Sequence, residues 1–239
     1  MPLATTPSRL GSNLQQDATT ALWPNRLAQP GADLAPPGFD PGYEVQTMRQ
    51  IIENSDNHRP SEAVYQRMSL SEYLELPTSN LICEWVAGWA VLMPPEYSDN
   101  GFAAFELGFL LKTMFPDLNP IIQSGLDVSD ESKRIPDLAV YPRRVPNQVF
   151  VADQPIIVAE VLSEATRKQD LVVKRAEYAA RGIDQYWILD PKQRRLTVLV
   201  NVAGEYLAAA SLDDEHPVAE VEVSPYGKVL LDLNVIMPA

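Results

Sequence analysis

The stretch from Arg134 to Pro191 decides how this sequence folds. It contains, in order, the segments IPDLAVY (135–141), PIIVAEVLS (155–163) and QYWILD (185–190). Each segment is a short run of aliphatic and β-branched residues, which is typical of a buried strand. Burying the acids in these segments, Asp137 and Glu160, is costly unless a cation or a hydrogen-bond donor compensates their charge. If their strands are neighbours, the two acids form a candidate site for a hard cation.

A helix is predicted between the last two segments, from Arg167 to Arg181. Thr166 and Gln169 have the spacing of a capping box at its start, and Gly182 is placed as its left-handed C-terminal cap. Asp170, Lys174 and Tyr178 follow one another at intervals of four residues and therefore share a helix face. Lys174 can serve a site beside the two acids. Asp170 and Lys174 can equally be a simple ion pair on the helix.

The part of the chain before this stretch predicts shorter elements. Ser69 and Glu72 form a capping box at a helix start. Two apolar runs, 81–86 and 89–93, flank Ala87-Gly88 and predict a β-hairpin, on which Glu84 is expected to face solvent. We also expect a mostly buried helix at 100–115, based on Phe102, Phe105, Leu107, Phe109, Leu110 and Met114, and one strand at 121–128.

Beyond the stretch the pattern is that of a strand meander. Further strands are expected at 195–200, 205–210, 218–223 and 228–233. Strands, a crossover helix and more strands predict an α/β fold with a mixed β-sheet core flanked by helices. Residues 61–239 are expected to form a single domain. Residues 1–60 are rich in proline and glycine and are expected to be a mobile N-terminal extension.

Composition excludes several kinds of chemistry. Cys83 is the only cysteine of the 239 residues, and His58 and His216 are the only histidines and lie in polar, loop-like surroundings. An intramolecular disulfide is therefore excluded, and a zinc site or a Ser-His-Asp triad is disfavoured. Any chemistry must use carboxylates, lysine and an oxygen-binding metal. We see neither a secretory signal nor a membrane-spanning run, so a cytoplasmic location is expected.

The net charge of −13 disfavours binding to nucleic acid. The charge is unevenly distributed, however, because residues 133–175 hold eight basic and five acidic side chains. Local charge dominates at close range, since salt screens charges beyond about 10 Å. Four basic residues in this region are candidate phosphate contacts, or alternatively solvated surface charges: Arg143, Arg144, Arg167 and Lys168.

The longer pattern resembles a known family. It comprises Pro136-Asp137, the run Val158 to Ser163, then Thr166, Asp170, Lys174, Tyr178, Gly182 and the run Tyr186 to Pro191, preceded by Met68 to Leu74, Glu84, Gly88 and Met93-Pro94-Pro95. In this order these residues resemble the Uma-type restriction endonuclease-like family of the PD-(D/E)xK nuclease superfamily. The resemblance covers roughly residues 67–212.

This resemblance implies a restriction-endonuclease-like fold and metal-dependent hydrolysis of phosphodiester bonds in DNA. It implies that Asp137 and Glu160 are catalytic and bind Mg²⁺, or Mn²⁺ as a substitute. The main-chain carbonyl of Val161 would be a third ligand, and Glu84 a further acid near the metal. It also implies that Lys174 is catalytic, from the helix that follows the strand.

Two departures from the pattern matter. The superfamily's usual lysine position, two residues after the glutamate, holds Leu162, so that the displaced Lys174 must take the role. A histidine that family members often carry after the Pro-Pro turn is absent from residues 96–100, where Asp99 or Asn100 could take part of its role.

The sequence therefore leaves two alternatives to a DNA endonuclease. One is a catalytically inactive nuclease-fold module that binds nucleic acid or protein, and the other is a plain assembly subunit. Cutting both DNA strands would favour a homodimer.

Overall fold

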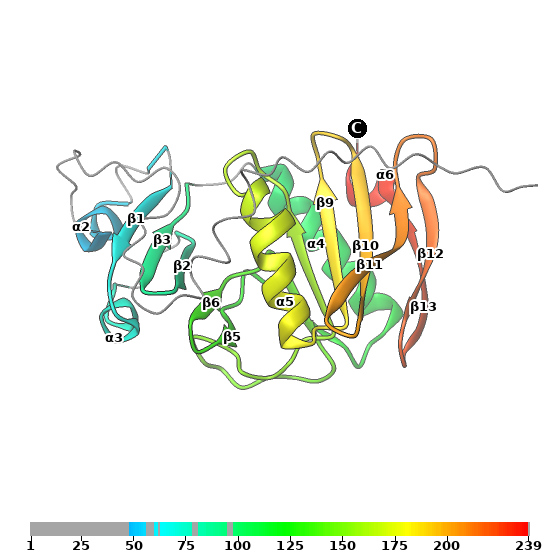
Figure 1. The fold of residues 1–239 in the computed structure, drawn as a ribbon. Helices are drawn as coiled ribbons and strands as arrows, with labels where there is room; N and C mark the ends of the chain where they lie inside the picture. Colours follow the sequence, from blue (N-terminus) through cyan, green and yellow to red (C-terminus); the bar gives the residue numbers. More distant parts are fainter. Residues whose placement is uncertain (1–47, 56–59, 62, 78–80, 95–97, 239) are drawn as a thin grey trace, which may run out of the picture. The chain divides into compact units, whose positions relative to one another are not determined.

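The computed structural model describes residues 48–55, 60–61, 63–77, 81–94 and 98–238. Most of the predicted extension, residues 1–60, lies outside the described residues. The described chain forms an α/β fold, as expected, with a six-stranded sheet, a five-stranded sheet and a two-stranded sheet (Figure 1).

The six-stranded sheet contains the three apolar segments with which the sequence analysis began, at 135–141, 155–163 and 185–190. Its strand order is β11-β10-β9-β8-β7-β4, where only β8 and β9 are parallel neighbours. The bounds are β4 Asn119–Ile122, β7 Leu138–Tyr141, β8 Ile157–Val161, β9 Gln185–Asp190, β10 Arg195–Val202 and β11 Glu205–Leu212. The helical connection between β8 and β9 is what makes their parallel pairing possible.

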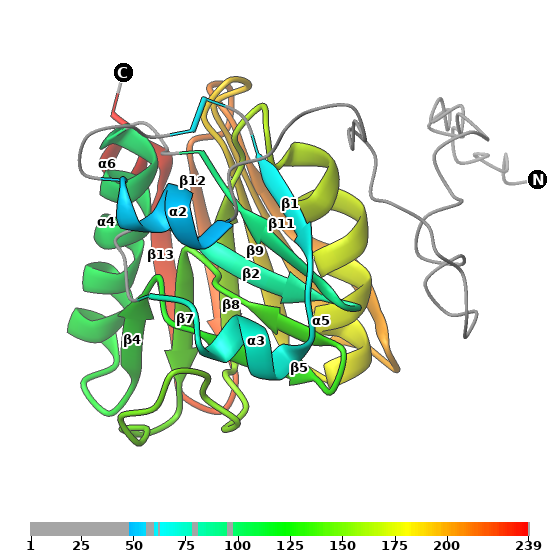
Figure 2. The same cartoon turned by 90° about the vertical axis from the view of Figure 1, so that its left-hand side faces the viewer.

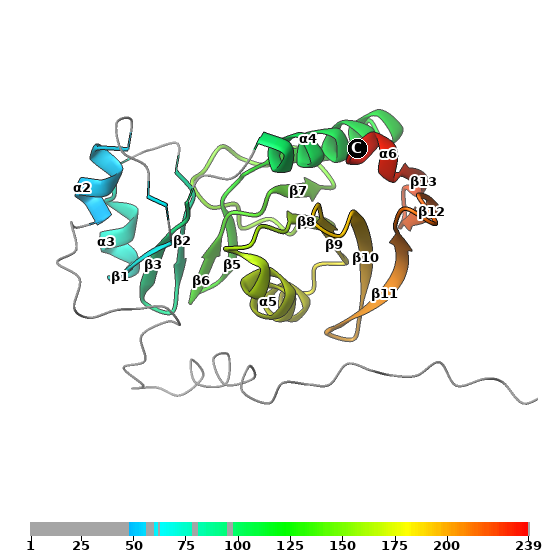
Figure 3. The ribbon, with the colours of Figure 1, turned by 90° about the horizontal axis from the view of Figure 1, so that it is seen from above.

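Helices cover both faces of this sheet. The side chains of a strand alternate between the two faces, so Ile157, Ala159 and Val161 of β8 enter one apolar core while Val158 enters the other. The first core contains helix α4 (Ser98–Met114), helix α6 (Leu233–Ile236) and the hairpin of β12 (Val218–Val223) and β13 (Gly227–Asp232). The second core contains helix α5 (Arg175–Arg181). Figure 3 shows α4 and α5 on opposite sides of the sheet.

The five-stranded sheet has the order β1-β3-β2-β6-β5 and is antiparallel throughout. Its strands are β1 Val64–Arg67, β2 Cys83–Val86, β3 Trp89–Leu92, β5 Leu126–Ser129 and β6 Ser132–Arg134. Helices α2 (Met48–Glu53) and α3 (Leu70–Leu74) pack on it through a third, smaller core (Figure 2). Glu84 lies on β2, beside β6.

Several local predictions are confirmed. The hairpin of β2 and β3 turns at Ala87-Gly88, and both residues have positive φ, as a two-residue hairpin turn requires. Ser69 and Glu72 form the predicted capping box of α3. Gly182 ends α5 in the left-handed conformation, with φ of 82°. The strands expected beyond residue 194 are all present.

Other expectations were wrong. The single strand expected at 121–128 is two strands of different sheets, β4 and β5, because the chain turns at Gln123, whose φ is 48°. The helix expected to be mostly buried, α4, exposes Phe102, Phe105, Phe109 and Met114. It packs on the sheet through its other face, where Ala103, Ala104, Leu107 and Leu111 are buried and Gly108 lies close to Leu138. Among the described residues, no helix is both long and apolar enough to cross a membrane.

The helix after β8 also begins differently from the prediction. Ser163 and Thr166 cap it reciprocally, since the Thr166 amide donates to Ser163 Oγ (3.2 Å) and the Ser163 amide to Thr166 Oγ1 (3.4 Å). Gln169 takes no part in this box. Residues Gln169–Lys174 form a π-helical segment, η1, which continues directly into α5. Such wide turns are often found at functional sites.

Candidate functional site

Strand alternation brings Glu160 to the face of the sheet that η1 and α5 cover. Ala159 and Val161 point into the core on the α4 side, so Glu160, between them, points the other way, towards Lys174 and Tyr178. Lys174 Nζ donates to Glu160 Oε1 at 3.0 Å, and Tyr178 donates its hydroxyl proton to the same oxygen at 2.9 Å. Tyr178 is completely buried, and its hydroxyl group belongs to this cluster.

Asp137 immediately precedes β7, opposite the end of β8. Leu138 pairs with Ala159 in the antiparallel register, which places Asp137 beside Glu160 and Val161. The amide of Val161 donates to Asp137 Oδ2 at 2.7 Å. The two acids on which the sequence interpretation rested therefore do lie on neighbouring strands.

Glu84 joins the cluster from the five-stranded sheet. We expected this side chain to face solvent, but it is completely buried. Its carboxylate accepts from Arg134 Nη1 at 2.8 Å and from the Ile135 amide at 3.0 Å, and it lies 3.3 Å from Lys174 Nζ. The expectation failed because the Glu84 side chain faces Arg134 and Lys174, which come from segments fifty or more residues later in the chain.

Lys174 is the common partner of the acids. Its ammonium group lies within 3.3 Å of carboxylate oxygens of Glu84, Glu160 and Asp170. All four of these side chains are nearly inaccessible to solvent. Burial opposes the charged form of Lys174, but Asp170, Glu160 and Glu84 outweigh burial and raise its pKa well above the ordinary value. Lys174 is therefore a fixed cation.

The acids of the cluster do not share one ionisation behaviour. Burial raises the pKa of Glu160 well above its ordinary value, and the charge of Lys174 offsets this only in part because Asp170 and Asp137 lie nearby. Burial also opposes ionisation of Glu84, but Lys174 and Arg134 outweigh it, so the pKa of Glu84 is lowered. The cations beside Glu84 therefore favour its ionised form, whereas burial disfavours the ionised form of Glu160.

Arg134 is a part of the cluster that the sequence interpretation missed. It is almost completely buried, and besides Glu84 it binds both carboxylate oxygens of Glu177 at 2.8 Å. The pKa of Arg134 is raised, because Glu177 and Glu84 outweigh the effect of burial. The one feature of the sequence that could have pointed to Arg134 is its position directly before the segment Ile135-Pro136-Asp137.

The four candidate phosphate contacts are not brought together. Arg167 and Lys168 begin the helix that follows the end of β8, on the side of Glu160 and Val161. Arg143 and Arg144 follow the opposite end of β7, where Arg143 is exposed and pairs with Asp153 at 3.0 Å. Arg167 pairs with Asp190 at 2.7 Å and is half-buried, whereas Lys168 is exposed. Of the region without the family histidine, residues 95–97 are not described, and Asn100 is buried on α4.

A small depression opens onto the cluster. Its lining consists of Ile82, Glu84, Met93, Ile135, Asp137, Glu160, Thr166 and Lys174. Within the described part of the chain, no three acidic, cysteine or histidine side chains converge as a ready-made metal cage. The donors nevertheless suit a hard cation, since Mg²⁺ usually takes one or two carboxylates and completes its coordination with water.

Comparison with known proteins addresses the fold and the family of the chain. A crystal structure described as that of a "putative nuclease" from Anabaena variabilis is similar, with a TM-score of 0.58 and 17% identity over 71% of this chain and 97% of the other. At that identity the likeness shows the fold alone. No curated protein was found to match. The Uma2 family, described as "putative restriction endonuclease", matches residues 70–232, which include every residue of the cluster. The chain therefore belongs to the Uma2 family.

Proposed function

We propose that the protein is a Mg²⁺-dependent DNA endonuclease whose catalytic residues are Asp137, Glu160 and Lys174. One observation carries the proposal: Glu84, Asp137, Glu160 and Lys174 come from four separate parts of the chain and line the same depression. The family and the nuclease-like fold support a nuclease of this kind. Mn²⁺ is expected to substitute for Mg²⁺.

The excess of acidic side chains in the cluster supports binding of a divalent metal ion. Ion pairs connect four carboxyl groups, those of Glu84, Glu160, Asp170 and Glu177, with two basic groups, those of Arg134 and Lys174, and Asp137 lies beside Glu160. An excess of acids in a largely buried site favours protonation or a bound cation. Asp137 and Glu160 would hold the ion, with the Val161 carbonyl and Glu84 as further oxygen donors. When bound, a divalent cation offsets phosphate charge and lowers the pKa of a water molecule.

In this proposal, side chains of the protein orient the two acids and stabilise the charge that develops on the phosphate. Asp137 is held in place by the Val161 amide, and Glu160 is oriented by the Tyr178 hydroxyl group and Lys174. Lys174 would stabilise the negative charge that develops on the phosphate as the bond to the leaving oxygen breaks. Its ion pairs with Asp170 and Glu84 keep it positioned without requiring reorganisation.

DNA is the proposed partner. Arg167 and Lys168 are the better-placed phosphate contacts, since they lie on the side of the sheet where β8 ends. Arg143 and Arg144 would reach only a part of the duplex distant from the scissile bond. The division of the chain into an extension, 1–60, and a nuclease domain, 61–239, stays a prediction, as does a cytoplasmic location.

The test is cleavage of supercoiled plasmid with Mg²⁺ or Mn²⁺. Wild type should nick or linearise the plasmid, and EDTA should stop the reaction. Glu160→Gln keeps the size of the side chain but loses the anionic ligand, so activity should fall by roughly two orders of magnitude or more. Glu222→Gln, at an exposed position of β12, is the matched control and should cut like wild type. Full activity of Glu160→Gln would refute the site assignment.

A second candidate function is a catalytically inactive module that binds nucleic acid or protein. The observation in its favour is that Lys174 pairs with three of the acids. Its charge partly neutralises theirs without a metal ion. A calorimetric titration with Mn²⁺ separates the two candidates. Binding in wild type that Glu160→Gln weakens supports the nuclease. Absence of binding at millimolar Mn²⁺, together with DNA binding that does not change on adding metal, supports the module.

A further inference from the structure

The two hydrogen-bond donors that reach the Glu160 side chain bind the same one of its two carboxylate oxygens. Lys174 Nζ donates to Oε1 at 3.0 Å, and the Tyr178 hydroxyl group donates to that oxygen at 2.9 Å. Within the described residues, no hydrogen bond to Oε2 is found. Glu160 lines the depression, so Oε2 is the oxygen that its neighbours leave to a ligand there.

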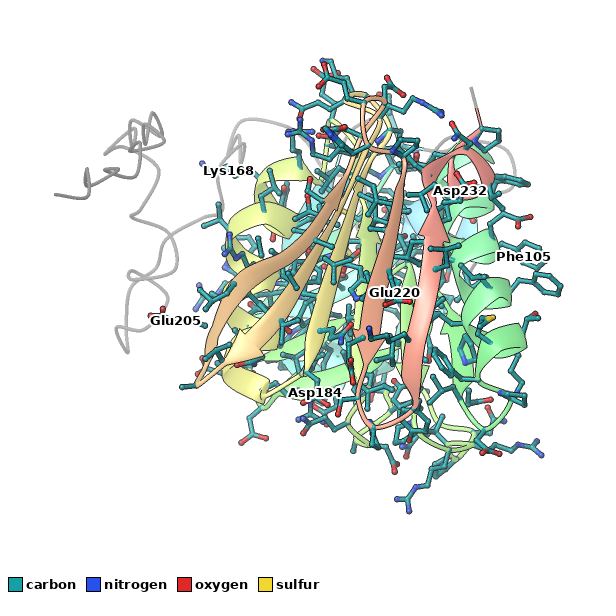
Figure 4. All side chains as sticks on the ribbon, turned by 90° about the vertical axis from the view of Figure 1, so that its right-hand side faces the viewer. Phe105, Lys168, Asp184, Glu205, Glu220 and Asp232 are labelled. Carbon is teal, nitrogen blue, oxygen red and sulfur yellow. The ribbon has the colours of Figure 1, made fainter. Side chains whose placement is uncertain are left out.

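The helix that carries both donors changes its winding between them, from the π-helical η1 to the α-helical α5. Figure 4 shows this helix along the sheet, from Lys168 near its start towards Asp184 beyond its end. Four residues of an α-helix turn about 40° more than a full circle. Four residues of a π-helix, with its bonds from i to i+5, turn less than a full circle. The steps from Asp170 to Lys174 and from Lys174 to Tyr178 therefore deviate in opposite directions, which keeps the three side chains in line and brings two of them to one oxygen.

Of the two donors, Tyr178 is the one that packing holds in place. Its ring meets that of Tyr186 edge-on, with centroids 5.4 Å apart and an angle of 73° between the rings. Tyr186 is itself held by the hydrogen bond from its hydroxyl group to the main-chain carbonyl of Asp170, at 3.0 Å. Both rings are completely buried. The lysine ammonium group, in contrast, ends a flexible four-carbon chain. The tyrosine hydroxyl group is therefore the rigid reference for the Glu160 carboxylate.

We propose that Tyr178 is a positioning residue, which holds Glu160 so that Oε2 is the oxygen presented to the metal ion. The inference rests on the proposed nuclease function, because it concerns the divalent cation of that site. The terminal torsion of a glutamate side chain is broad and does not by itself favour one oxygen over the other. A fixed donor on Oε1 removes that freedom. Groups that orient metal ligands in this way typically change metal affinity or activity by roughly 10- to 100-fold.

Tyr206 on β11 provides a matched control in the same apolar core. It is also buried and packs against Tyr186, with ring centroids 5.7 Å apart. Its hydroxyl group donates at 2.9 Å, the same distance as that of Tyr178, but to the main-chain carbonyl of Ile183. That carbonyl also accepts from Asn201 Nδ2, so it keeps a partner when the hydroxyl group is removed. Tyr206→Phe thus removes an equivalent hydrogen bond without altering the acid cluster.

Calorimetric titration of the full chain with Mn²⁺ tests the proposal. Tyr178→Phe keeps the ring and removes only the hydroxyl group, so the Kd for Mn²⁺ should rise roughly 10- to 100-fold. Tyr206→Phe should bind Mn²⁺ like wild type. The urea midpoints of the two variants should move by similar amounts, because each loses one hydrogen bond of the same length. Raising the Mn²⁺ concentration should restore part of the plasmid cleavage by Tyr178→Phe, which a defect of folding would not allow.

Three results would overturn the proposal. A wild type and a Tyr178→Phe variant that bind Mn²⁺ equally tightly would refute the positioning role alone and leave the nuclease proposal standing. An equal loss of Mn²⁺ affinity in Tyr206→Phe would show that the effect comes from the packing of the core. A wild type that binds no Mn²⁺ at millimolar concentration would refute the positioning role and the metal-dependent nuclease together. The affinity of the wild type therefore tells the two failures apart.

Discussion

Cys83 illustrates how burial alters the chemistry of one residue. Its thiol group lies in the small core of the five-stranded sheet, with Sγ 3.6 Å from Met48 Sδ. Burial, with a contribution from the charge of Glu84, raises the pKa of Cys83 to about 12. The thiolate is the reactive form of cysteine, so this residue is inert in the folded protein.

The raised pKa predicts loss of stability at alkaline pH. The folded protein holds the Cys83 proton up to about pH 12, whereas the unfolded chain releases it above about pH 8.5. The contribution to stability is therefore fully present below pH 8.5 and falls by up to about 1.4 kcal/mol per pH unit above it. Urea unfolding between pH 8 and 11 should show a shallower decline in Cys83→Ala than in wild type. Equal slopes would contradict the assignment.

Other side chains show that a residue's type does not reveal its neighbours. Glu160 was singled out because an acid in mid-strand has few structural reasons to be there, and the structure does place it in the cluster. Glu84 has the same local context, an acid within an apolar strand, and was assigned to solvent. The difference is Arg134, fifty residues later, which compensates Glu84.

At the scale of elements, turn and cap residues were the most predictable features. Ser69 caps α3 through its side chain and the nearby backbone, and Gly88 and Gly182 act through their own positive φ, so these structures follow from short-range chemistry. The break between β4 and β5 was missed, although Gly125 follows it. Gly125 sits where another backbone approaches: its carbonyl accepts from the Val151 amide at 2.9 Å.

Substitution of Gly125 should therefore be severe. A Cβ atom at this position would lie 2.1 Å from the Val149 carbonyl oxygen, a backbone atom that cannot move aside cheaply. Gly125→Ala should lower the free energy of unfolding by about 2–3 kcal/mol or more.

Gly101→Ala is the control for this substitution. Its Cβ would meet nothing within 4 Å, and alanine favours a helix by about 0.5–1 kcal/mol over glycine. Urea midpoints at low protein concentration should therefore move in opposite directions for the two variants. A midpoint for Gly125→Ala equal to that of wild type would show that the loop at 149–151 can shift freely.

At the scale of the whole described molecule, the two larger sheets meet at one buried ion network. Arg134, on β6, joins Glu84 of β2 to Glu177 of α5, and Lys174 continues the network to Glu160 of β8. These contacts connect the five-stranded sheet with the helix that covers the six-stranded sheet. The candidate site therefore lies at a junction that neither sheet forms alone.

Removal of Arg134 tests this junction. Arg134→Met keeps much of the side-chain volume but leaves Glu84 buried without its guanidinium partner, which should cost about 3–5 kcal/mol. Arg143→Met removes an exposed ion pair with Asp153 and should cost about 1 kcal/mol or less. Chemical denaturation of both variants gives the comparison. Adding Glu84→Gln to Arg134→Met should restore part of the loss, and equal stability of the two single variants would contradict a structural role of the network.

The sequence by itself predicted the strands from β7 to β13, a helix between β8 and β9, the hairpin turn, the caps at Ser69 and Gly182, and the proximity of Asp137 to Glu160. These follow from periodicity, from short-range backbone chemistry, and from the order of motifs that the chain shares with its family. Only the tertiary structure decided that Glu84 is buried, that Arg134 compensates it, and that the phenylalanines of α4 face outward. Which face of an element is covered depends on segments tens of residues away, and a local pattern carries no information about them.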